Sequence, residues 1–313
     1  MSDVIHGLDS VPASLRGCAV TIGNFDGVHL GHQQILLTCR SLAHTDRRPV
    51  VAMTFDPLPE VLLRPREEAP PLILPPAKRY DVLLQSGADF VVTVPATGEL
   101  LALPARTFVD EVIMQHFAPL HVVEGADFFF GRSRGGNVVT LENMGISRGF
   151  SVSVSQSVVL MLPEGQRRVS STLIRELIRD GRVEDAAACL GRPFALYGTV
   201  VPGQQKGRTL GFPTINLATS DQVVPSDGVY AGRATMGNVS YLAAISIGNK
   251  VTFGPVERTI EAYLLDASGD FYGLAVELSL LRRLRPQQKF DSPVALMAQI
   301  AKDVAAVREL GQV

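Results

Sequence analysis

The stretch Thr21-Ile22-Gly23-Asn24-Phe25-Asp26-Gly27-Val28-His29-Leu30-Gly31-His32 joins two different patterns of apolar residues. Before it, Gly17–Gly23 is a short apolar run that predicts a buried strand. After it, apolar residues recur near helical spacing and predict a helix over His29–Ala43. Glycines at the turn let the backbone approach a ligand, and a helix N-terminus offers free N–H donors to a phosphate. The stretch therefore predicts a strand, a turn with an anion site, and a helix.

The same alternation continues through the first half of the chain. Further apolar runs predict strands at Pro49–Phe55, Phe90–Val94, Leu120–Glu124 and Ser151–Val159. Helical spacing between them predicts helices at Lys78–Gln85, Ala105–His116 and Asn137–Met144. Repeated strand–helix–strand units imply a mainly parallel sheet that helices cover on both faces.

The second half has another character. Helices are predicted at Thr172–Asp180 and Val183–Leu190, followed by short strands separated by Gly, Pro, Asp and Asn. These strands are predicted at Ala195–Val201, Gly228–Thr235, Tyr241–Ile247, Arg258–Leu265 and Ala275–Arg282. Their close spacing is typical of a small antiparallel barrel, which a helix at Pro293–Glu309 would follow. We expect two domains, residues 1–190 and 191–313.

Composition excludes several classes of partner. The formal net charge of −2 gives no global attraction to nucleic acid or to an anionic membrane, so a site for a polyanion must be built locally. Cys18, Cys39 and Cys189 lack metal-ligand spacing and are expected to be small buried residues. The sequence shows no secretory signal and no apolar run long enough to span a bilayer. A cytoplasmic protein that binds small molecules is expected.

His29 and His32 are three residues apart, which places them on one face of the predicted helix. Imidazole N–H groups there can stabilise charge that develops on the α-phosphate of a nucleotide. A His-x-x-His pair can also hold a metal, but no third ligand of the usual kind is nearby. The flanking glycines favour the phosphate interpretation.

The pattern Gly-x-x-Asp-Gly-x-His-x-Gly-His over residues 23–32 resembles the signature of the nucleotidylyltransferase superfamily. Its individual residues are similar to those of this motif in bacterial bifunctional riboflavin kinase/FAD synthetases. The resemblance implies a Rossmann-like α/β nucleotidylyltransferase domain followed by a six-stranded antiparallel β-barrel with riboflavin kinase activity. It implies that His29 and His32 are catalytic. It also implies a nucleotide-binding role for the rest of this turn, namely Gly23, Asn24, Phe25, Asp26, Gly27 and Gly31.

Three further segments resemble the same family. Thr54–Pro59 matches its Phe-Asp-Pro-His-Pro pattern except at Leu58, where the family usually has histidine. Gly125–Gly131 resembles a loop in which Asp127 would hydrogen-bond the nucleotide or flavin and the phenylalanines would face the flavin, although three phenylalanines after a strand more often belong to a core. Ser170–Arg175 resembles Ser-Ser-Thr-x-x-Arg, so the resemblance assigns the leaving phosphates to Ser170, Ser171, Thr172 and Arg175. Ser170 is also a plausible helix N-cap.

A second phosphate site is predicted in the barrel half. The sequence has no P-loop, but Gly203–Asn216 combines glycines, two cations and a hydroxyl on what we expect to be a loop. Its end resembles the riboflavin kinase signature, in which the ATP-binding positions are Gly207, Arg208, Gly211, Pro213, Thr214 and Asn216. The resemblance assigns Mg²⁺ to Thr214 and Asn216, and the catalytic base to Glu261. Tyr263 stands where the family usually has histidine.

The resemblance implies an enzyme of FAD biosynthesis that uses ATP and Mg²⁺. It would phosphorylate riboflavin to FMN and then adenylylate FMN to FAD with release of pyrophosphate. Two alternatives stay open: a chain active in only one of these steps, or a catalytically silent protein that senses flavin or nucleotide. Neither nucleic acid nor a membrane is expected as a partner.

Overall fold

The computed structural model describes residues 3–65, 68–203, 212–219, 221–249 and 258–311. The chain divides into two compact units, Met1–Ser170 and Ser171–Val313, and each is described by itself.

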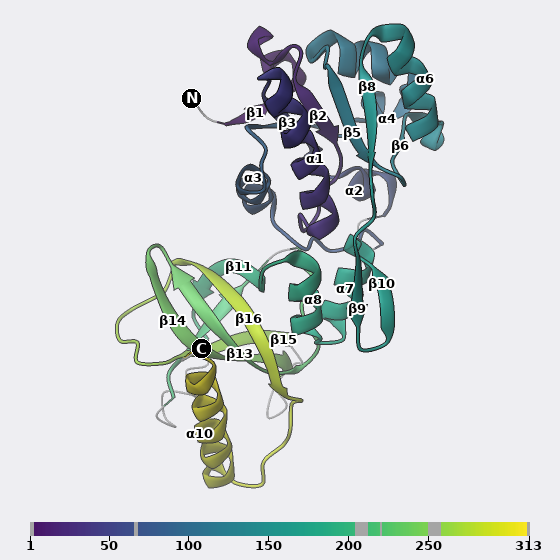
Figure 1. Ribbon diagram of the computed structural model, residues 1–313. Coiled ribbons are helices and arrows are strands. Elements are labelled where there is room, and N and C mark those ends of the chain that lie inside the picture. The colour runs from purple at the N-terminus through teal and green to yellow at the C-terminus, as the bar shows by residue number, and fades with distance from the viewer. Residues whose placement is uncertain (1–2, 66–67, 204–211, 220, 250–257, 312–313) are drawn as a thin grey trace. The chain divides into compact units, whose positions relative to one another are not determined.

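The first unit is built on a parallel sheet of six strands (Figure 1). Its order across the sheet is β1-β4-β3-β2-β5-β8, and every pair of neighbours is parallel. The bounds are β1 Val4–His6, β2 Ala19–Ile22, β3 Val50–Phe55, β4 Phe90–Val94, β5 His121–Gly125 and β8 Ser151–Ser155. The parallel sheet predicted from sequence is confirmed. The three-residue edge strand β1 was not predicted, because so short a run carries no periodicity.

Both faces of the central strand β2 are covered, since all four of its residues are buried. Helix α1, Leu30–Asp46, lies against β2, β3 and β5 and buries Leu36, Cys39 and Ala43. A large apolar cluster joins alternate residues of β2, such as Val20 and Ile22, to the helical segment 105–114. That segment begins as α5, Ala105–Thr107, and continues as the π-helical stretch η3, Phe108–Met114.

The remaining helices of this unit are α2 Pro59–Leu63, α3 Pro76–Gln85, α4 Gly98–Ala102 and α6 Val138–Arg148. Short 3-10 turns occur at Leu8–Ser10, Ala13–Leu15 and Arg132–Arg134. Two small hairpins complete it, one from β6 Phe129–Phe130 and β7 Gly136–Asn137, the other from β9 Val159–Leu162 and β10 Gly165–Arg168.

One predicted strand is wrong in extent. Ser151–Val159 was expected to be continuous, but β8 ends at Ser155 and β9 begins at Val159. β8 pairs with β5 in the parallel sheet, whereas β9 pairs with β10 across a two-residue turn at 163–164. The partners of the two segments differ, and local apolar composition does not reveal partners.

The second unit contains a closed antiparallel barrel of six strands in the order β11-β12-β15-β14-β13-β16 (Figure 1). The bounds are β11 Phe194–Val201, β12 Thr214–Ala218, β13 Gly228–Met236, β14 Val239–Asn249, β15 Arg258–Leu264 and β16 Ala275–Arg285. Alternate residues are buried along the strands, as Ile260, Ala262 and Leu264 are along β15. The predicted barrel is therefore confirmed.

Among the described residues of this unit, three helices accompany the barrel: α7 Ser171–Arg179, α8 Val183–Leu190 and α10 Pro293–Leu310. α8 lies against β11 and β16, and α10 lies against β13 and β14. The assignment of residues 171–190 to the first domain stays a prediction. Across the described ranges, no helix combines the length and the apolar composition that crossing a bilayer requires.

The expected loop over Gly203–Asn216 is wrong at its end, because Thr214 already begins β12. Asn216 pairs with Val201 of β11 on one side and with Glu261 of β15 on the other. The pairing with β15 comes from a strand distant in sequence, so the local Gly-rich composition was misleading.

Candidate functional site

The predicted turn lies at the carboxyl end of β2, where the chain order of the sheet reverses. From β2 the chain moves to β3 and β4 on one side, while β5 and β8 lie on the other. In an open parallel sheet, the crevice at such a switch point is the usual ligand site. The sequence-predicted anion site thus lies where the topology favours one.

The backbone of this turn is tightly constrained. Phe25, Gly27 and Val28 have positive φ values of 48°, 82° and 41°. A Cβ atom on Gly27 would lie only 3.0 Å from Cγ2 of Ile73. Glycine is therefore required at position 27 both by its φ angle and by the close approach of Ile73.

Asp26 connects the turn to a distant segment of the backbone. Its side chain is only 2% exposed, and its Oδ1 accepts hydrogen bonds from the backbone N–H groups of Ile73, at 3.0 Å, and Leu74, at 3.2 Å. The carboxylate thereby ties the turn after β2 to the segment that precedes α3. These contacts favour a scaffolding contribution of Asp26 to the site.

His29 and His32 lie together at the start of α1. Their rings are stacked, with centroids 3.7 Å apart and planes inclined by 17°. His29 is the N-cap, and its Nδ1 accepts a long hydrogen bond of 3.4 Å from the His32 backbone N–H. An Nδ1 that accepts leaves Nε2 as the protonated nitrogen of a neutral His29 ring.

The electrostatics of the pair favour a neutral His32 ring. Burial, followed by the nearby His29, lowers the pKa of His32 well below its usual range. The ring edge of Phe25 packs on His32 with centroids 5.2 Å apart. Within the described part of the chain, His32 Nδ1 is buried without a hydrogen-bond partner. A buried polar nitrogen in this state is suited to a ligand group that reaches it.

Arg79 of α3 is a component of this region that sequence reasoning missed. It is fully buried, and it donates to the carbonyl of Asn24 at 3.2 Å and to that of Phe55 at 2.8 Å. Thr54 Oγ1 donates to the same Asn24 carbonyl at 3.2 Å. Arg79 thus links the chain segments that leave β2 and β3. Nothing in the local sequence distinguishes it from a solvated helix arginine.

The segment after β5 contains both core and surface residues. Phe130 is 6% exposed and belongs to the apolar core, and Phe128 stacks on it with centroids 5.4 Å apart. Phe129 is 44% exposed, with the Arg134 guanidinium 4.1 Å from its ring centroid. The carboxylate of Asp127 forms an ion pair with Arg168, at the end of β10.

Two other predicted segments, around Leu58 and Arg175, place side chains in buried surroundings. Leu58 is 4% exposed and directly precedes α2, so its side chain is part of a packed interior. Ser170 precedes α7, whose first residues are Ser171 and Thr172. Arg175 on this helix is 8% exposed, which is unusual for an arginine.

In the second unit, the barrel register brings the predicted kinase residues together. Asn216 lies directly opposite Glu261, and Thr214 lies opposite Tyr263, across the β12–β15 pair. Residues directly opposite each other share a face, so all four side chains emerge on the same side of the barrel wall. Their neighbours Ile215 and Ala262 are buried on the other face.

The loop that leads into this face is described only in part. A Cβ atom on Gly203 would fall 2.1 Å from Asn216 Nδ2, so this backbone runs against the Asn216 amide. Pro213 is exposed, and Phe212 meets the Tyr263 ring edge-on with centroids 5.3 Å apart. The predicted ATP-binding residues Gly207, Arg208 and Gly211 lie outside the described residues.

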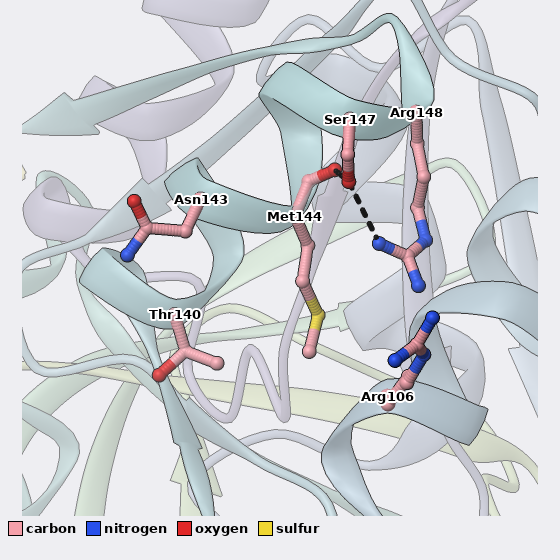
Figure 2. A pocket seen from close by; sticks show the side chains of 6 residues that line it. All are labelled: Arg106, Thr140, Asn143, Met144, Ser147 and Arg148. Atoms are coloured by element: carbon pink, nitrogen blue, oxygen red, sulfur yellow. Dashed lines mark hydrogen bonds between the residues drawn. The ribbon is translucent and has the colours of Figure 1, made fainter.

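A hollow of about 320 Å³ lies elsewhere on the first unit (Figure 2). It is lined by Arg106, Thr140, Asn143, Met144, Ser147 and Arg148. Figure 2 shows the guanidinium groups of Arg106 and Arg148 turned toward each other. Asp110 pairs with both, at 3.8 Å from Arg106 Nε and 2.5 Å from Arg148 Nε, so much of their charge is compensated. The hollow includes none of the predicted site residues.

Comparison with known proteins covers both units. Residues 11–173 match the FAD synthetase family, and residues 190–310 match the riboflavin kinase family. The bifunctional riboflavin kinase/FMN adenylyltransferase of Escherichia coli K12 is 35% identical over 306 residues, which are 97% of this chain and 96% of that protein. The protein of the same description from Bacillus subtilis 168 is 32% identical over 91% of this chain and 89% of its own length.

A solved structure, described as a macrolide-efflux protein from Streptococcus pneumoniae, has the same fold. It superposes with a TM-score of 0.87 at 31% identity, over 98% of this chain and 99% of that one. Both family matches occur in the predicted order, and the curated relatives align over nearly the full chain. The chain belongs to the family of bifunctional riboflavin kinases/FMN adenylyltransferases.

Proposed function

We propose that this chain phosphorylates riboflavin to FMN with ATP and then adenylylates FMN to FAD. The observation that carries the proposal is the barrel register, which sets Asn216 directly opposite Glu261 and so supports a kinase site between β12 and β15. The stacked histidine pair at the switch point of the first unit supports the second activity independently.

In FAD formation, an oxygen of the FMN phosphate attacks the α-phosphate of ATP and pyrophosphate leaves. His29 and His32 would donate N–H hydrogen bonds to the phosphate oxygens on which charge accumulates. The contribution of His32 is directional hydrogen bonding from a neutral ring, because burial disfavours its charged form. The backbone N–H groups at the start of α1 and the turn over Gly23–Gly27 would hold the phosphates.

Other predicted residues of this reaction keep their proposed roles. Gly31 is close-packed under the site, since a Cβ there would lie 3.1 Å from the His29 ring. Asp127 would orient the nucleotide or flavin. We assign the leaving pyrophosphate to Ser170, Ser171, Thr172 and Arg175, on the grounds of the family pattern alone.

In FMN formation, the 5′-hydroxyl of riboflavin attacks the γ-phosphate of ATP, the bond from the γ-phosphorus to the bridging oxygen breaks, and ADP leaves. Glu261 would accept the hydroxyl proton, as a general base must lie within hydrogen-bond reach of the attacking group. Thr214 and Asn216 fit a Mg²⁺ site, because they offer hard oxygen donors beside a carboxylate on one face of the barrel. When bound, Mg²⁺ neutralises charge on the transferred phosphate.

A chain with only one activity is the nearest alternative. Leu58 stands where the family usually has histidine, so this position offers no imidazole. The leucine side chain is buried. The stacked pair His29 and His32 is nevertheless complete. A silent flavin or nucleotide sensor would need neither this pair nor a carboxylate beside Asn216. Both observations favour the bifunctional enzyme.

The test separates the two activities by mutation. Purified protein is given either riboflavin or FMN, with ATP and Mg²⁺, and the flavins are resolved by chromatography. We expect Glu261→Gln to abolish FMN formation while FMN is still converted to FAD, and His32→Ala to have the converse effect. Glu277→Gln is the matched control, since Glu277 lies on β16, three strands from β15 in either direction around the barrel.

The outcomes are distinct. Production of FAD from riboflavin by the unmodified protein supports the bifunctional proposal. Production of FMN alone would show that the chain is a riboflavin kinase only. Unchanged riboflavin and FMN would favour the sensor. If Glu261→Gln stopped both steps equally, or if neither variant impaired a step, the assignment of these residues would be wrong.

A further inference from the structure

The ladder between β2 and β5 stops short of the carboxyl ends of both strands. It pairs Ala19 with His121 and Val20 with Val122 and goes no further. On their other sides the two strands continue: β2 pairs with β3 through Ile22, and β5 pairs with β8 through Gly125. The sheet therefore opens at its switch point, where the two loops of the adenylyl-transfer site begin.

The Glu124 side chain spans this opening. Its Oε1 accepts a hydrogen bond of 2.7 Å from the backbone N–H of Ile22. The next N–H along, that of Gly23, bonds to Met53 on the β3 side at 3.0 Å. Ile22 is thus the last residue of β2 whose N–H is directed toward β5, and a side chain satisfies it where a main-chain carbonyl would otherwise be needed.

Glu124 is an unexpected residue for this position. It is 2% exposed and directly follows the buried pair Val122 and Val123, one residue before the end of β5. Burial raises its pKa well above the usual range for a glutamate. A neutral carboxyl still accepts the Ile22 hydrogen bond, and it places no negative charge beside a site for phosphates.

Two further buried polar atoms lie at the same edge of the sheet. Within the described residues, Thr21 Oγ1 on β2 and Ser155 Oγ at the end of β8 have no hydrogen-bond partner. Ser155 is opposite Gly125, the residue after Glu124. Unsatisfied polar atoms are costly to bury in a sheet of apolar strands, so their presence here fits an edge built around a ligand.

We propose that Glu124 is a positioning residue for adenylyl transfer: its side chain bridges the strand ends and fixes the separation between the loop after β2 and the loop after β5. The bridge holds Ile22, and with it the turn that carries His29, in place relative to Asp127. This inference rests on the proposed FMN adenylyltransferase activity of the first unit.

Three variants distinguish positioning from acid–base chemistry. Glu124→Gln keeps both the reach and a neutral oxygen acceptor for Ile22. Glu124→Asp keeps the carboxyl group, but the side chain is one methylene too short to reach the backbone N–H of Ile22. Glu124→Val loses both and suits a buried strand. FMN-to-FAD conversion is measured as kcat and KM over a range of pH, and riboflavin phosphorylation by the same samples serves as the internal control.

For a positioning role, Glu124→Gln keeps kcat for FAD formation within about twofold, with an unchanged pH profile. Glu124→Asp and Glu124→Val lose roughly 10- to 100-fold in kcat, because misplacement of reacting groups by about 1 Å has that effect. FMN formation is unchanged in all three.

The opposite order, with Glu124→Asp active and Glu124→Gln inactive, would overturn the proposal in favour of direct proton transfer. Equal activity of all three variants would also overturn it. If Glu124→Val fails to fold, the Gln and Asp pair still decides. Failure of the unmodified protein to convert FMN would instead contradict the proposed function itself.

Discussion

The turn at Gly27 allows a prediction in which backbone strain and packing can be separated. Gly27→Ala introduces a side chain at φ +82°, which costs an L-residue about 1–2 kcal/mol. The new Cβ would also lie 3.0, 3.2 and 3.3 Å from three side-chain atoms of Ile73. Overpacking of this kind adds about 1–3 kcal/mol. The expected loss of stability is therefore about 2–5 kcal/mol.

Gly149→Ala is the matched control for this variant. Gly149 has φ +81°, lies in the same unit at the C-terminus of α6, and has nothing within 4 Å of an added Cβ. It should lose only the strain contribution of about 1–2 kcal/mol. The difference between the two variants then measures the contact with Ile73.

Unfolding is followed by calorimetry, and both half-reactions are assayed. Since Asp26 holds the Ile73 backbone, a displaced Ile73 should also disturb the site, so Gly27→Ala should reduce FAD formation while FMN formation persists. Replacing Ile73 by Ala in the same protein should recover part of the loss, and a double-mutant cycle measures that coupling. Equal destabilisation by Gly27→Ala and Gly149→Ala, with FAD formation intact in both, would refute the reasoning.

Two further predictions concern charge. Because the pKa of His32 is lowered in the folded state, the unfolded chain binds its proton first as pH falls through about 6.5, so stability decreases with falling pH in that range. His32→Gln should reduce this pH dependence of the melting temperature, whereas His44→Gln, at an exposed position, should leave it in place. The same pH dependence in the unmodified protein and in both variants would contradict its assignment to His32. In the barrel, Arg285 Nη2 contacts Asp303 Oδ2 at 2.8 Å with both side chains largely buried. Asp303→Ala should destabilise the second unit by about 3–5 kcal/mol, as expected when one partner of a buried ion pair is removed. Asp266→Ala, which breaks the exposed pair with Arg308, should change the melting of the second unit little. Similar effects of the two substitutions would show that burial does not govern how much these ion pairs contribute to stability.

Local sequence was informative wherever chemistry and periodicity coincide in one stretch. The apolar run, the glycines and the histidine pair over residues 17–32 sufficed to predict a strand, a turn and a helix. The alternation of strands and helices predicted the parallel sheet, and the short spacing of later strands predicted the barrel. These features depend on the 2.0 and 3.6 periodicities and on turn chemistry, which act over a few residues.

Local sequence left the roles of several other residues undecided. Asp26 was predicted as a ligand-binding residue, yet its carboxylate holds the N–H groups of Ile73 and Leu74. Arg79 carried no signal at all, although it joins the segments that leave β2 and β3. A carboxylate or guanidinium acquires such a role only from the backbone groups that face it, and these come from distant parts of the chain.

By itself, then, the sequence determined the class of each unit, the place of the histidine pair and the family to which the chain belongs. Only the tertiary structure decided that Asn216 faces Glu261, that β2 and β5 part at the switch point, and that Glu124 spans the gap. The physical reason is that pattern and turn preferences are local, whereas strand register and the satisfaction of buried polar groups depend on residues many positions away.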